Sequence, residues 1–315
     1  MTGRTILVMG GAHVDRRGRI AGETAAGASN PGSWFVEAGG GGFNAARNLA
    51  RLGRAVRLVS PRGGDADGDL VAAAAQAAGI EDTPFVFLDR ATPSYTAILE
   101  RDGNLVVALA DMGLYDLFSP RRLRQRALRE AVAEAGLVLA DANLPAETLA
   151  ALAAAARDAG VPVAGIAISP AKVVRFRAAL PTLSILFMNE AEARALTGAE
   201  VDDPALWPQA LRRAGLAAGV VTRGGGCVTA FEGPRTVRAD PPRLPALGDV
   251  TGAGDALAAG FLDARLAGAT LGEALRRGVA AAAITVRSPL AVAGEMAPAT
   301  LAEALALVPE AEILS

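Results

Sequence analysis

The sequence predicts an α/β protein with a central, mostly parallel β-sheet and helices on both faces. Short apolar segments of strand length alternate with helix-like segments along most of the chain, and this alternation is typical of a parallel sheet covered by helices. Glycine follows several of the helix candidates, where it favours the end of a helix. Apolar residues make up 51% of the 315 residues, which is enough for one large core.

The first elements already show this alternation. The segment 44–52 predicts a helix because apolar side chains recur at Ala45, Leu49 and Leu52, and Gly53 ends the pattern. The elements expected in this part of the chain are a strand at 6–9, a helix at 44–52, a strand at 56–59 and a helix at 69–78.

Two segments interrupt the alternation. Residues 95–100 and 105–110 predict a β-hairpin around the turn at Asp102-Gly103-Asn104. Residues 16–38 are polar, glycine-rich and poorly periodic. Because neither segment fits the main sheet, we expect both to belong to a small β lid on one edge of a single domain. The expected domain spans 1–315, with the lid at about 13–38 and 91–112.

From Pro120 onward the helix–strand rhythm returns, which extends the predicted parallel sheet. The helices expected here are 121–135, 146–159, 190–196, 205–214, 254–266 and 272–286, and the strands are 137–140, 163–168, 185–188 and 219–222, with a hairpin at 227–231 and 235–238.

Composition excludes several classes of function. The net charge of −2 argues against nucleic acid or an anionic membrane surface as a partner, since both require a basic field. The single cysteine, Cys227, excludes an intrachain disulfide framework and a cysteine zinc site, and it fits a reducing, cytoplasmic setting. No apolar stretch reaches the length of a membrane helix, and residues 1–9 do not resemble a signal peptide.

Lys172 is the single lysine of the chain, and no Gly-Lys-Ser/Thr tripeptide is present. A P-loop holds the phosphates of ATP with such a lysine. If the protein handles ATP, it must therefore do so by another device.

The strongest motif runs from residue 249 to residue 255, directly before an apolar helix. Gly252 and Gly254 allow backbone N–H groups to point at an anion, and the start of the helix adds partial positive charge. This is a site for a phosphoryl group in transfer, and the carboxylate of Asp255 at its edge can accept the proton of an attacking hydroxyl. The purely structural alternative is a helix N-cap with a tight turn.

Three further motifs support a phosphate or sugar site. The four glycines at 39–42, followed by Phe43 and Asn44, permit close backbone approach to a ligand, although they could also form a turn with an asparagine cap. Asn189 to Glu192 follows a strand, and Glu192 could hold a hydrated Mg²⁺ or merely belong to a capped helix start. Thr222 to Gly226 could cradle a nucleotide phosphate or form a hairpin turn.

These motifs, in this order, resemble the PfkB, or ribokinase-like, carbohydrate kinase family over nearly the whole chain. Residues 39–44 with the following helix look like its first signature, and residues 249–255 look like its second. Asn189 to Glu192 is similar to the Asn-x-x-Glu element that manages Mg²⁺ and phosphate. The tripeptide at 222–224 is similar to the Thr-x-Gly nucleotide loop.

The resemblance implies an ATP- and Mg²⁺-dependent kinase with a ribokinase-like fold. The implied catalytic residues are Asp255, as the base, and Gly252, Ala253 and Gly254, as the anion hole. The implied binding residues are Asp15, Gly40, Gly41, Asn44 and Asn143 for the acceptor, Asn189, Thr222, Gly224 and Gly225 for the nucleotide, Glu192 for Mg²⁺ through water, and Asp249 and Thr251 for a monovalent cation such as K⁺.

Within that family, several stretches look most like pseudouridine kinases, which phosphorylate the ribose 5′-hydroxyl of a C-nucleoside. The stretches that carry this likeness are 11–15, 29–32, 110–112 with Tyr115, 141–143 and 169–172. The sequence departs from them at Phe43, where those kinases usually have arginine, and at Phe187-Met188, where a proline-containing approach to Asn189 is more common.

We interpret Asp15 as the ligand of the sugar. It follows the first strand, and its two carboxylate oxygens suit two vicinal hydroxyls such as O2′ and O3′ of ribose, with Asn44 sharing one of them. The 5′-hydroxyl would then point at Asp255. The lid would cover the acceptor and exclude water, and the candidates to line it are Tyr95, Thr96, Ile98 and Val107.

Alternatives stay open at this point. The acceptor could be another compound, such as ribose, adenosine, fructose or another keto-hexose, or a phosphosugar held by Arg47, Arg90 or Arg101. A dinucleotide-binding oxidoreductase is a remote alternative, because no Gly-x-Gly-x-x-Gly follows the first strand. A non-catalytic binding protein on the same scaffold is a third. An exposed lid edge could pair two subunits into a homodimer.

Overall fold

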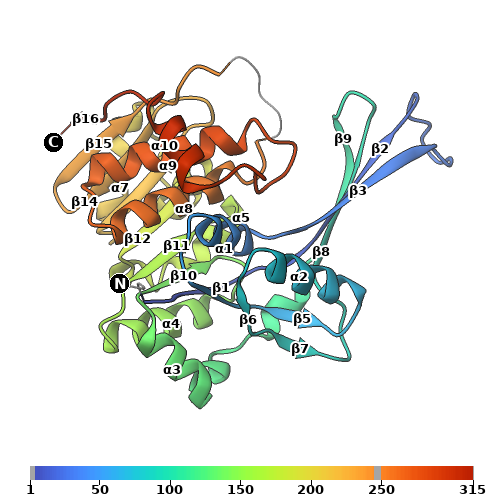
Figure 1. Ribbon diagram of the computed structural model, residues 1–315, viewed down its shortest axis with the longest axis horizontal. Coiled ribbons are helices and arrows are strands. Elements are labelled where there is room, and N and C mark those ends of the chain that lie inside the picture. The colour runs from blue at the N-terminus through green and yellow to red at the C-terminus, as the bar shows by residue number, and fades with distance from the viewer. Residues whose placement is uncertain (1–3, 245–249, 315) are drawn as a thin grey trace.

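A large β-sheet forms the centre of the molecule (Figure 1). The computed structural model describes residues 4–244 and 250–314. Within these residues the main sheet has ten strands, in the order β16-β15-β14-β13-β12-β11-β10-β1-β4-β6. The strands are β1 (Ile6–Met9), β4 (Val56–Val59), β6 (Glu81–Asp82), β10 (Leu137–Asp141), β11 (Val163–Ile166), β12 (Ile185–Asn189), β13 (Ala218–Thr222), β14 (Val228–Glu232), β15 (Arg235–Ala239) and β16 (Glu312–Ile313).

The prediction of a mostly parallel sheet is confirmed. Each neighbouring pair from β6 to β13 runs parallel, while β13 to β16 are antiparallel. The chain leaves β1 toward β4 on one side and later returns to β10 on the other. The strand order therefore reverses at β1, and ligands of open α/β sheets bind beyond the carboxyl ends of the strands at such a point.

Helices cover both faces of the sheet, as predicted. Neighbouring residues of a strand point to opposite faces, and the apolar side chains on both faces need to be buried. In β1, Ile6 and Val8 belong to one buried cluster, and Leu7 and Met9 belong to the other. The first cluster packs against α1 (Gly41–Arg51), α2 (Ala66–Ala77), α8 (Ala253–Leu266), α9 (Leu271–Thr285) and α10 (Pro298–Leu305). The second packs against α3 (Arg126–Glu134), α4 (Ala146–Asp158), α5 (Pro170–Val173), α6 (Glu190–Thr197) and α7 (Trp207–Arg213).

A second sheet of four strands projects from the body as an arm (Figure 1). Its order is β3 (Gly32–Gly39), β2 (His13–Ile20), β8 (Ser94–Leu99) and β9 (Leu105–Asp111). The hairpin expected at 95–110 is the β8–β9 pair. A small parallel pair, β5 (Pro61–Gly63) and β7 (Phe85–Phe87), lies beside the body.

Residues 16–38, which show little periodicity in the sequence, contain most of β2 and β3, which pair over eight residues each. Most of β3 and all of β9 are exposed to solvent. A strand without a buried face needs no apolar alternation, so its sequence carries no period-two signal.

Two other boundaries differ from the expectation. The segment predicted as one helix at 121–135 is a 3₁₀ turn at Pro120–Arg124 followed by α3. The strand expected at 163–168 ends at Ile166, and Ile168 takes a left-handed φ of 70°. The break after β11 turns the chain across the carboxyl edge of the sheet.

Candidate active site

A cavity of about 650 Å³ lies at the carboxyl edge of the main sheet, which is within the size range of small-molecule sites. The walls combine residues that are far apart in the sequence, from β2, α1, the ends of β11 to β13, and the start of α8. The predicted site residues that line it are Asp15, Gly40, Gly41, Asn44, Asn143, Asn189, Glu192, Thr222, Thr251, Gly252, Gly254 and Asp255.

Asp255 lies in the first turn of α8 and faces the cavity. Its Oδ2 accepts a hydrogen bond of 2.9 Å from the side-chain amide of Asn44 on α1. Although the side chain is partly accessible through the cavity, protein surrounds it, and this burial raises the pKa of Asp255 to about 7. A carboxyl group of this kind is suited to general base catalysis near neutral pH.

The helix start beside Asp255 depends on glycine. Gly252, the N-cap of α8, has a left-handed φ of 77°, and a Cβ there would lie 2.1 Å from the carbonyl oxygen of Ala291. The N–H groups of the first turn of a helix lack partners within the helix and carry its positive pole, so this end of α8 suits an anion. The N–H of Ala253 donates to the carbonyl of Val250 at 3.2 Å, so that amide of the predicted anion hole is engaged in the turn.

Gly41 opens α1 directly beside the same carboxylate. A Cβ at Gly41 would lie 3.2 Å from Oδ1 of Asp255 and 2.3 Å from Cδ1 of Ile168. The glycine run therefore provides the space in front of Asp255 that a hydroxyl group would need.

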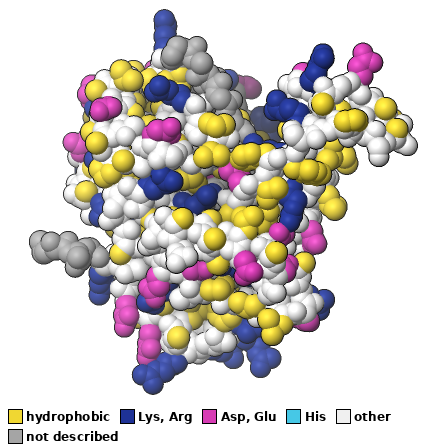
Figure 2. Space-filling view, turned by 45° about the vertical axis from the view of Figure 1, so that its right-hand side comes forward, with side chains coloured by type: hydrophobic (Ala, Val, Ile, Leu, Met, Phe, Trp, Pro, Cys, Tyr) yellow, Lys and Arg dark blue, Asp and Glu magenta, His cyan; other side chains and the backbone are white. Residues whose placement is uncertain are grey.

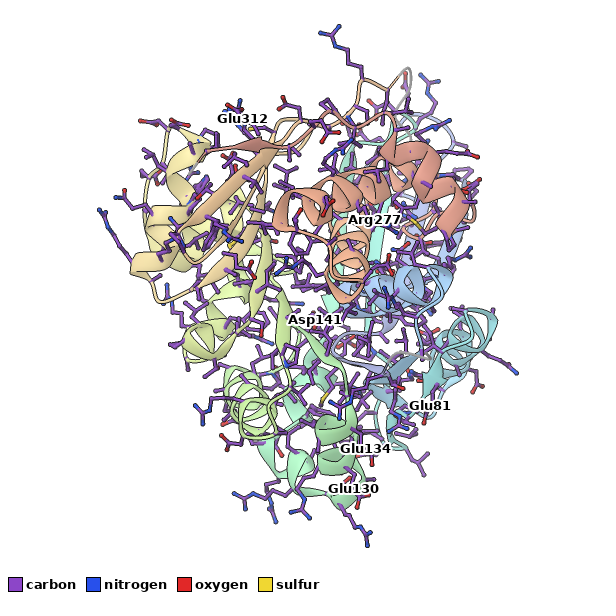
Figure 3. All side chains as sticks on the ribbon, turned by 60° about the vertical axis from the view of Figure 1, so that its left-hand side comes forward. Glu81, Glu130, Glu134, Asp141, Arg277 and Glu312 are labelled. Carbon is purple, nitrogen blue, oxygen red and sulfur yellow. The ribbon has the colours of Figure 1, made fainter. Side chains whose placement is uncertain are left out.

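Asp141 lies near the centre of the molecule (Figure 3), at the carboxyl end of β10, the strand next to β1. It is fully buried at the end of β10, and its Oδ2 accepts the N–H of Gly11 at 2.9 Å and the N–H of Gly42 at 2.8 Å. Its oxygens also accept the backbone and side-chain N–H groups of Asn143. This carboxylate, which the sequence interpretation included in the stretch 141–143 without giving it a role, fixes the start of α1 against the ends of β1 and β10.

Asn143 is buried in the cavity wall between two charged groups. Its Nδ2 donates to Asp141 at 3.1 Å, and its Oδ1 accepts a hydrogen bond of 2.6 Å from Nζ of Lys172. Burial lowers the pKa of Lys172 from its usual value. The single lysine of the chain thus lines the cavity and supplies a hydrogen-bond donor there.

Asp15 is held by the single histidine of the chain. It is the third residue of β2, so it belongs to the second sheet rather than to the end of the first strand. Oδ1 of Asp15 lies 3.3 Å from Nε2 of His13, and Nδ1 of His13 lies 2.9 Å from the hydroxyl of Tyr115. Tyr115 belongs to the stretches that resemble pseudouridine kinases, but that resemblance gave no role to its contact with His13.

The register of the second sheet decides which lid residues face the cavity. Asp15 pairs with Tyr95 across β2 and β8, and Tyr95 pairs with Ala110 across β8 and β9. These three residues form one row, and all three line the cavity. Of the four lid candidates, Tyr95 is in the lining, whereas Thr96, Ile98 and Val107 are not, and Val107 is exposed.

Glu192 and Asn189 form a capping box at the start of α6. Asn189 Oδ1 accepts the N–H of Glu192, and Glu192 Oε2 accepts the N–H of Asn189 at 2.7 Å. The structural alternative for this motif is therefore realised, yet both residues also line the cavity, and burial raises the pKa of Glu192. A lone carboxylate of this kind fits a Mg²⁺ ion that keeps its waters and binds phosphates. Among the described residues, no three acidic, histidine or cysteine side chains gather into a metal site.

Only some of the remaining residues predicted to bind the nucleotide or a monovalent cation line the cavity. Thr222 ends β13 in the cavity wall, but Gly224 and Gly225 lie in the exposed turn after it, outside the lining. Thr251 lies in the wall, whereas Asp249, its predicted partner for a monovalent cation, falls outside the described residues.

The arginines considered for a phosphosugar do not line the cavity. Arg90 pairs with Asp89 on the surface, and Arg101 lies in the exposed turn of the second sheet. Arg47 is half-buried on α1 and donates to Asn44 Oδ1 at 2.7 Å. Among the described residues, no helix has both the length and the apolar character needed to cross a membrane.

Comparison with known proteins gives a consistent result. The model of the family described as "pfkB family carbohydrate kinase" matches residues 5–297. The pseudouridine kinase of Escherichia coli K12 is 30% identical over 275 residues, which cover 86% of this chain and 87% of that protein. An uncharacterized sugar kinase of the same organism, YeiI, is 38% identical over 144 residues, and this match spans 45% of this chain and 39% of that protein.

Solved structures agree with the fold. A carbohydrate kinase from Agrobacterium tumefaciens superimposes with a TM-score of 0.91 at 60% identity, covering 99% of this chain and 100% of that one. The ribokinase of Arabidopsis thaliana, in complex with ribose and ATP, has a TM-score of 0.84 at 25% identity and covers 96% and 98% of the two chains. The fold is ribokinase-like, and the dinucleotide-binding alternative is excluded because β1 leads into β2 rather than into a helix.

Proposed function

Because the chain belongs to the pfkB family of carbohydrate kinases, whose members transfer phosphate to an alcohol group, we propose that it phosphorylates the 5′-hydroxyl of pseudouridine or a related nucleoside. The phosphoryl donor is ATP with Mg²⁺, and Asp255 is the general base. The observation that carries the proposal is the position of the Asp255 carboxylate at the start of α8, inside the cavity and next to Asn44 and Gly41.

This arrangement supports in-line phosphoryl transfer. Oδ2 of Asp255 is held by Asn44, so Oδ1, beside Gly41, is placed to accept the proton of the acceptor hydroxyl. The N-terminal turn of α8 lies next to the carboxylate and would stabilise the negative charge that develops on the transferred group. Mg²⁺, when bound near Glu192, would neutralise charge on the ATP phosphates. Thr222 and Asn189 would contact the nucleotide from the same edge of the sheet.

Asp15 supports a ribose-type acceptor. The Asp15–Tyr95–Ala110 row forms the wall that the second sheet contributes to the cavity, so an acceptor held by Asp15 would lie under that sheet. Oδ1 of Asp15 lies 3.3 Å from Nε2 of His13, and the carboxylate still has acceptor capacity for sugar hydroxyls. The second sheet would then act as the lid that excludes water during transfer.

Lys172 favours a nucleoside over a plain sugar. Its ammonium group and the nearby Ser169 lie in the cavity wall and can donate to the carbonyl oxygens of a pyrimidine ring. Phe43, the departure from pseudouridine kinases, is completely buried and does not line the cavity, so it does not obstruct a base. Another sugar acceptor, such as ribose or fructose, is the alternative, and the ribose complex of the Arabidopsis ribokinase supports it.

A coupled assay of ADP release with pseudouridine, uridine, adenosine, ribose and fructose tests the acceptor. We expect pseudouridine to give the highest kcat/KM, with ³¹P NMR identifying a 5′-phosphate. A preference for ribose or fructose would show that the protein is a sugar kinase rather than a nucleoside kinase. Nucleotide binding without ADP release from any acceptor would favour a non-catalytic binding protein on this scaffold.

We also propose that the second sheet pairs two copies of the chain. Apolar side chains lie along this arm in Figure 2, and the exposed large ones on its strands are Trp34, Phe35, Val36, Leu105, Val106, Val107 and Leu109. β3 and β9 are the free edges of this sheet in the described chain. The row of Trp34 and Val107 and the row of Val36 and Leu109 are two residues apart in the register, so these four side chains share one face, which a second copy of the same surface would cover. Analytical ultracentrifugation should show a dimer that Leu109→Glu dissociates, whereas Leu88→Glu, an equally apolar exposed site outside this sheet, should not. A monomeric wild type would contradict this assignment.

A further inference from the structure

Arg47 lies at the contact between the second sheet and the proposed catalytic base. Its Nη2 donates two hydrogen bonds of 2.7 Å, one to the backbone oxygen of Ala38 in β3 and one to Oδ1 of Asn44. The guanidinium also stacks over the Phe43 ring, 4.8 Å from its centroid. Phe43 stands where pseudouridine kinases usually have an arginine. The guanidinium group of Arg47 places a positive charge beside this position.

The chemistry of these donors fixes the orientation of Asn44. A guanidinium group can only donate, so the end of the Asn44 amide that faces Arg47 must be its oxygen. The nitrogen then faces Asp255, and this is the observed 2.9 Å contact to Oδ2. If the Asn44 amide were flipped, its NH₂ group would face the guanidinium donors of Arg47. Its oxygen would then face the carboxylate oxygen of Asp255.

Building on the proposed function, we propose that Arg47 is a positioning residue. It selects the Asn44 amide orientation that donates to Asp255 and ties that orientation to the end of β3. Ala38 is adjacent to Glu37, and Glu37 pairs with Asp15 in the register of the second sheet. The base and the acceptor-binding row are therefore connected through one guanidinium group.

The charges around the site agree with this role. Burial lowers the pKa of Arg47 to about 10, so the group stays protonated at neutral pH. Its positive charge lies near the carboxylates of Glu37, Asp255 and Asp15. Asp255 is further surrounded by Asp141 and Glu192, which favour its protonated form, whereas Asn44 and Arg47 favour its ionised form.

Arg47→Met keeps the aliphatic stem and removes every donor, and Arg47→Lys keeps one charged donor. Arg51→Met is the matched control, because Arg51 lies one turn further along α1 and bonds the carbonyl of Gly294. We expect Arg47→Met to lower kcat about tenfold with little change in the KM for ATP, since a misaligned base slows the chemical step. Arg47→Lys should recover part of that loss, and Arg51→Met should match the wild type.

A second measurement needs no turnover. With ¹³C-labelled aspartate carboxyl groups, the Asp255 signal is identified by its loss in Asp255→Asn, and its titration is followed in the ligand-free protein. Arg47→Met should move the Asp255 midpoint to higher pH, and the shift should shrink when Asn44→Ala is already present, because the effect passes through Asn44.

An equal shift in the Asn44→Ala background would overturn the proposal, because it would reduce Arg47 to a distant charge. An unchanged midpoint in both Arg47 variants would overturn it too, even if the wild type is an active kinase. Conversely, an inactive wild type in which the predicted shifts occur would remove the proposed function and leave the role of Arg47 intact. Thermal unfolding midpoints identify any variant that fails to fold, in which case Arg47→Lys supplies the comparison.

Discussion

The side-chain amide of Asn44 donates to the carboxylate of Asp255 at 2.9 Å, although the two residues are 211 positions apart in the chain. The contact joins the first turn of α1 to the first turn of α8, the two helices that begin at the glycine motifs. The two sequence signatures, residues 39–44 and 249–255, are thus linked by the hydrogen bond from Nδ2 of Asn44 to Oδ2 of Asp255. The predictions below follow from this geometry and from the groups that surround it.

The rate should depend on pH through Asp255. Because burial raises its pKa to about 7, the carboxyl is largely neutral below that pH and cannot accept the acceptor's proton. We expect kcat/KM for the acceptor to rise about tenfold per pH unit below the midpoint and to level off above it. A profile measured from about pH 5 to about pH 9 checks this, and an acid limb near the ordinary pKa of aspartate would contradict it.

Asp15→Ala should raise the KM for the acceptor about tenfold or more, because a charge-assisted hydrogen bond to a sugar hydroxyl is lost. The KM for ATP should change little. Asp102→Ala is the control, since Asp102 lies in the exposed turn of the same sheet. An unchanged acceptor KM in Asp15→Ala would remove Asp15 from the binding site.

His13 should carry its ring proton on Nε2. Nε2 faces the carboxylate of Asp15 at 3.3 Å, which can only accept a proton, whereas Nδ1 faces the hydroxyl of Tyr115 at 2.9 Å, which can donate one. Since the chain has one histidine, a ¹⁵N NMR spectrum of the untagged protein reports this ring alone. Tyr115→Phe should produce a mixture of tautomers, and a proton on Nδ1 in the wild type would contradict the assignment.

Gly252→Ala should cost more stability than Gly268→Ala. Both glycines have left-handed φ values, 77° and 89°, which cost alanine about 1 kcal/mol or more. A Cβ at Gly252 would in addition collide with the carbonyl of Ala291 at 2.1 Å, whereas nothing lies within 4 Å of a Cβ at Gly268. Chemical denaturation of both variants isolates the collision, and equal losses would show that the loop at Ala291 moves away freely.

The layered fold could be predicted from the sequence because each buried strand places alternate residues in two cores. β1 illustrates this, since its four residues are divided between the two clusters and all are buried. The start of α8 could also be predicted from the sequence, because Gly252 directly precedes the apolar helix and Gly254 lies in its first turn. Both features depend on local patterns, which a single sequence contains.

The second sheet was less readable, because most of β3 and all of β9 have no buried face to impose a pattern. Its register was also hidden, and only the structure shows that Tyr95, rather than Thr96 or Ile98, lies beside Asp15 in the cavity. The sequence named Arg47 only as a candidate to hold a phosphosugar, since its contacts to Ala38 and Asn44 exist only once β3 and α1 are packed together.

The most direct test of the account is the turnover of Asp255→Asn with ATP and the preferred acceptor. Asparagine keeps the shape of the side chain but cannot take a proton from the hydroxyl. We predict that kcat falls by about 10² or more, while the Kd for ATP, measured by calorimetry, stays close to that of the wild type. Turnover at the wild-type rate would show that a different group activates the acceptor.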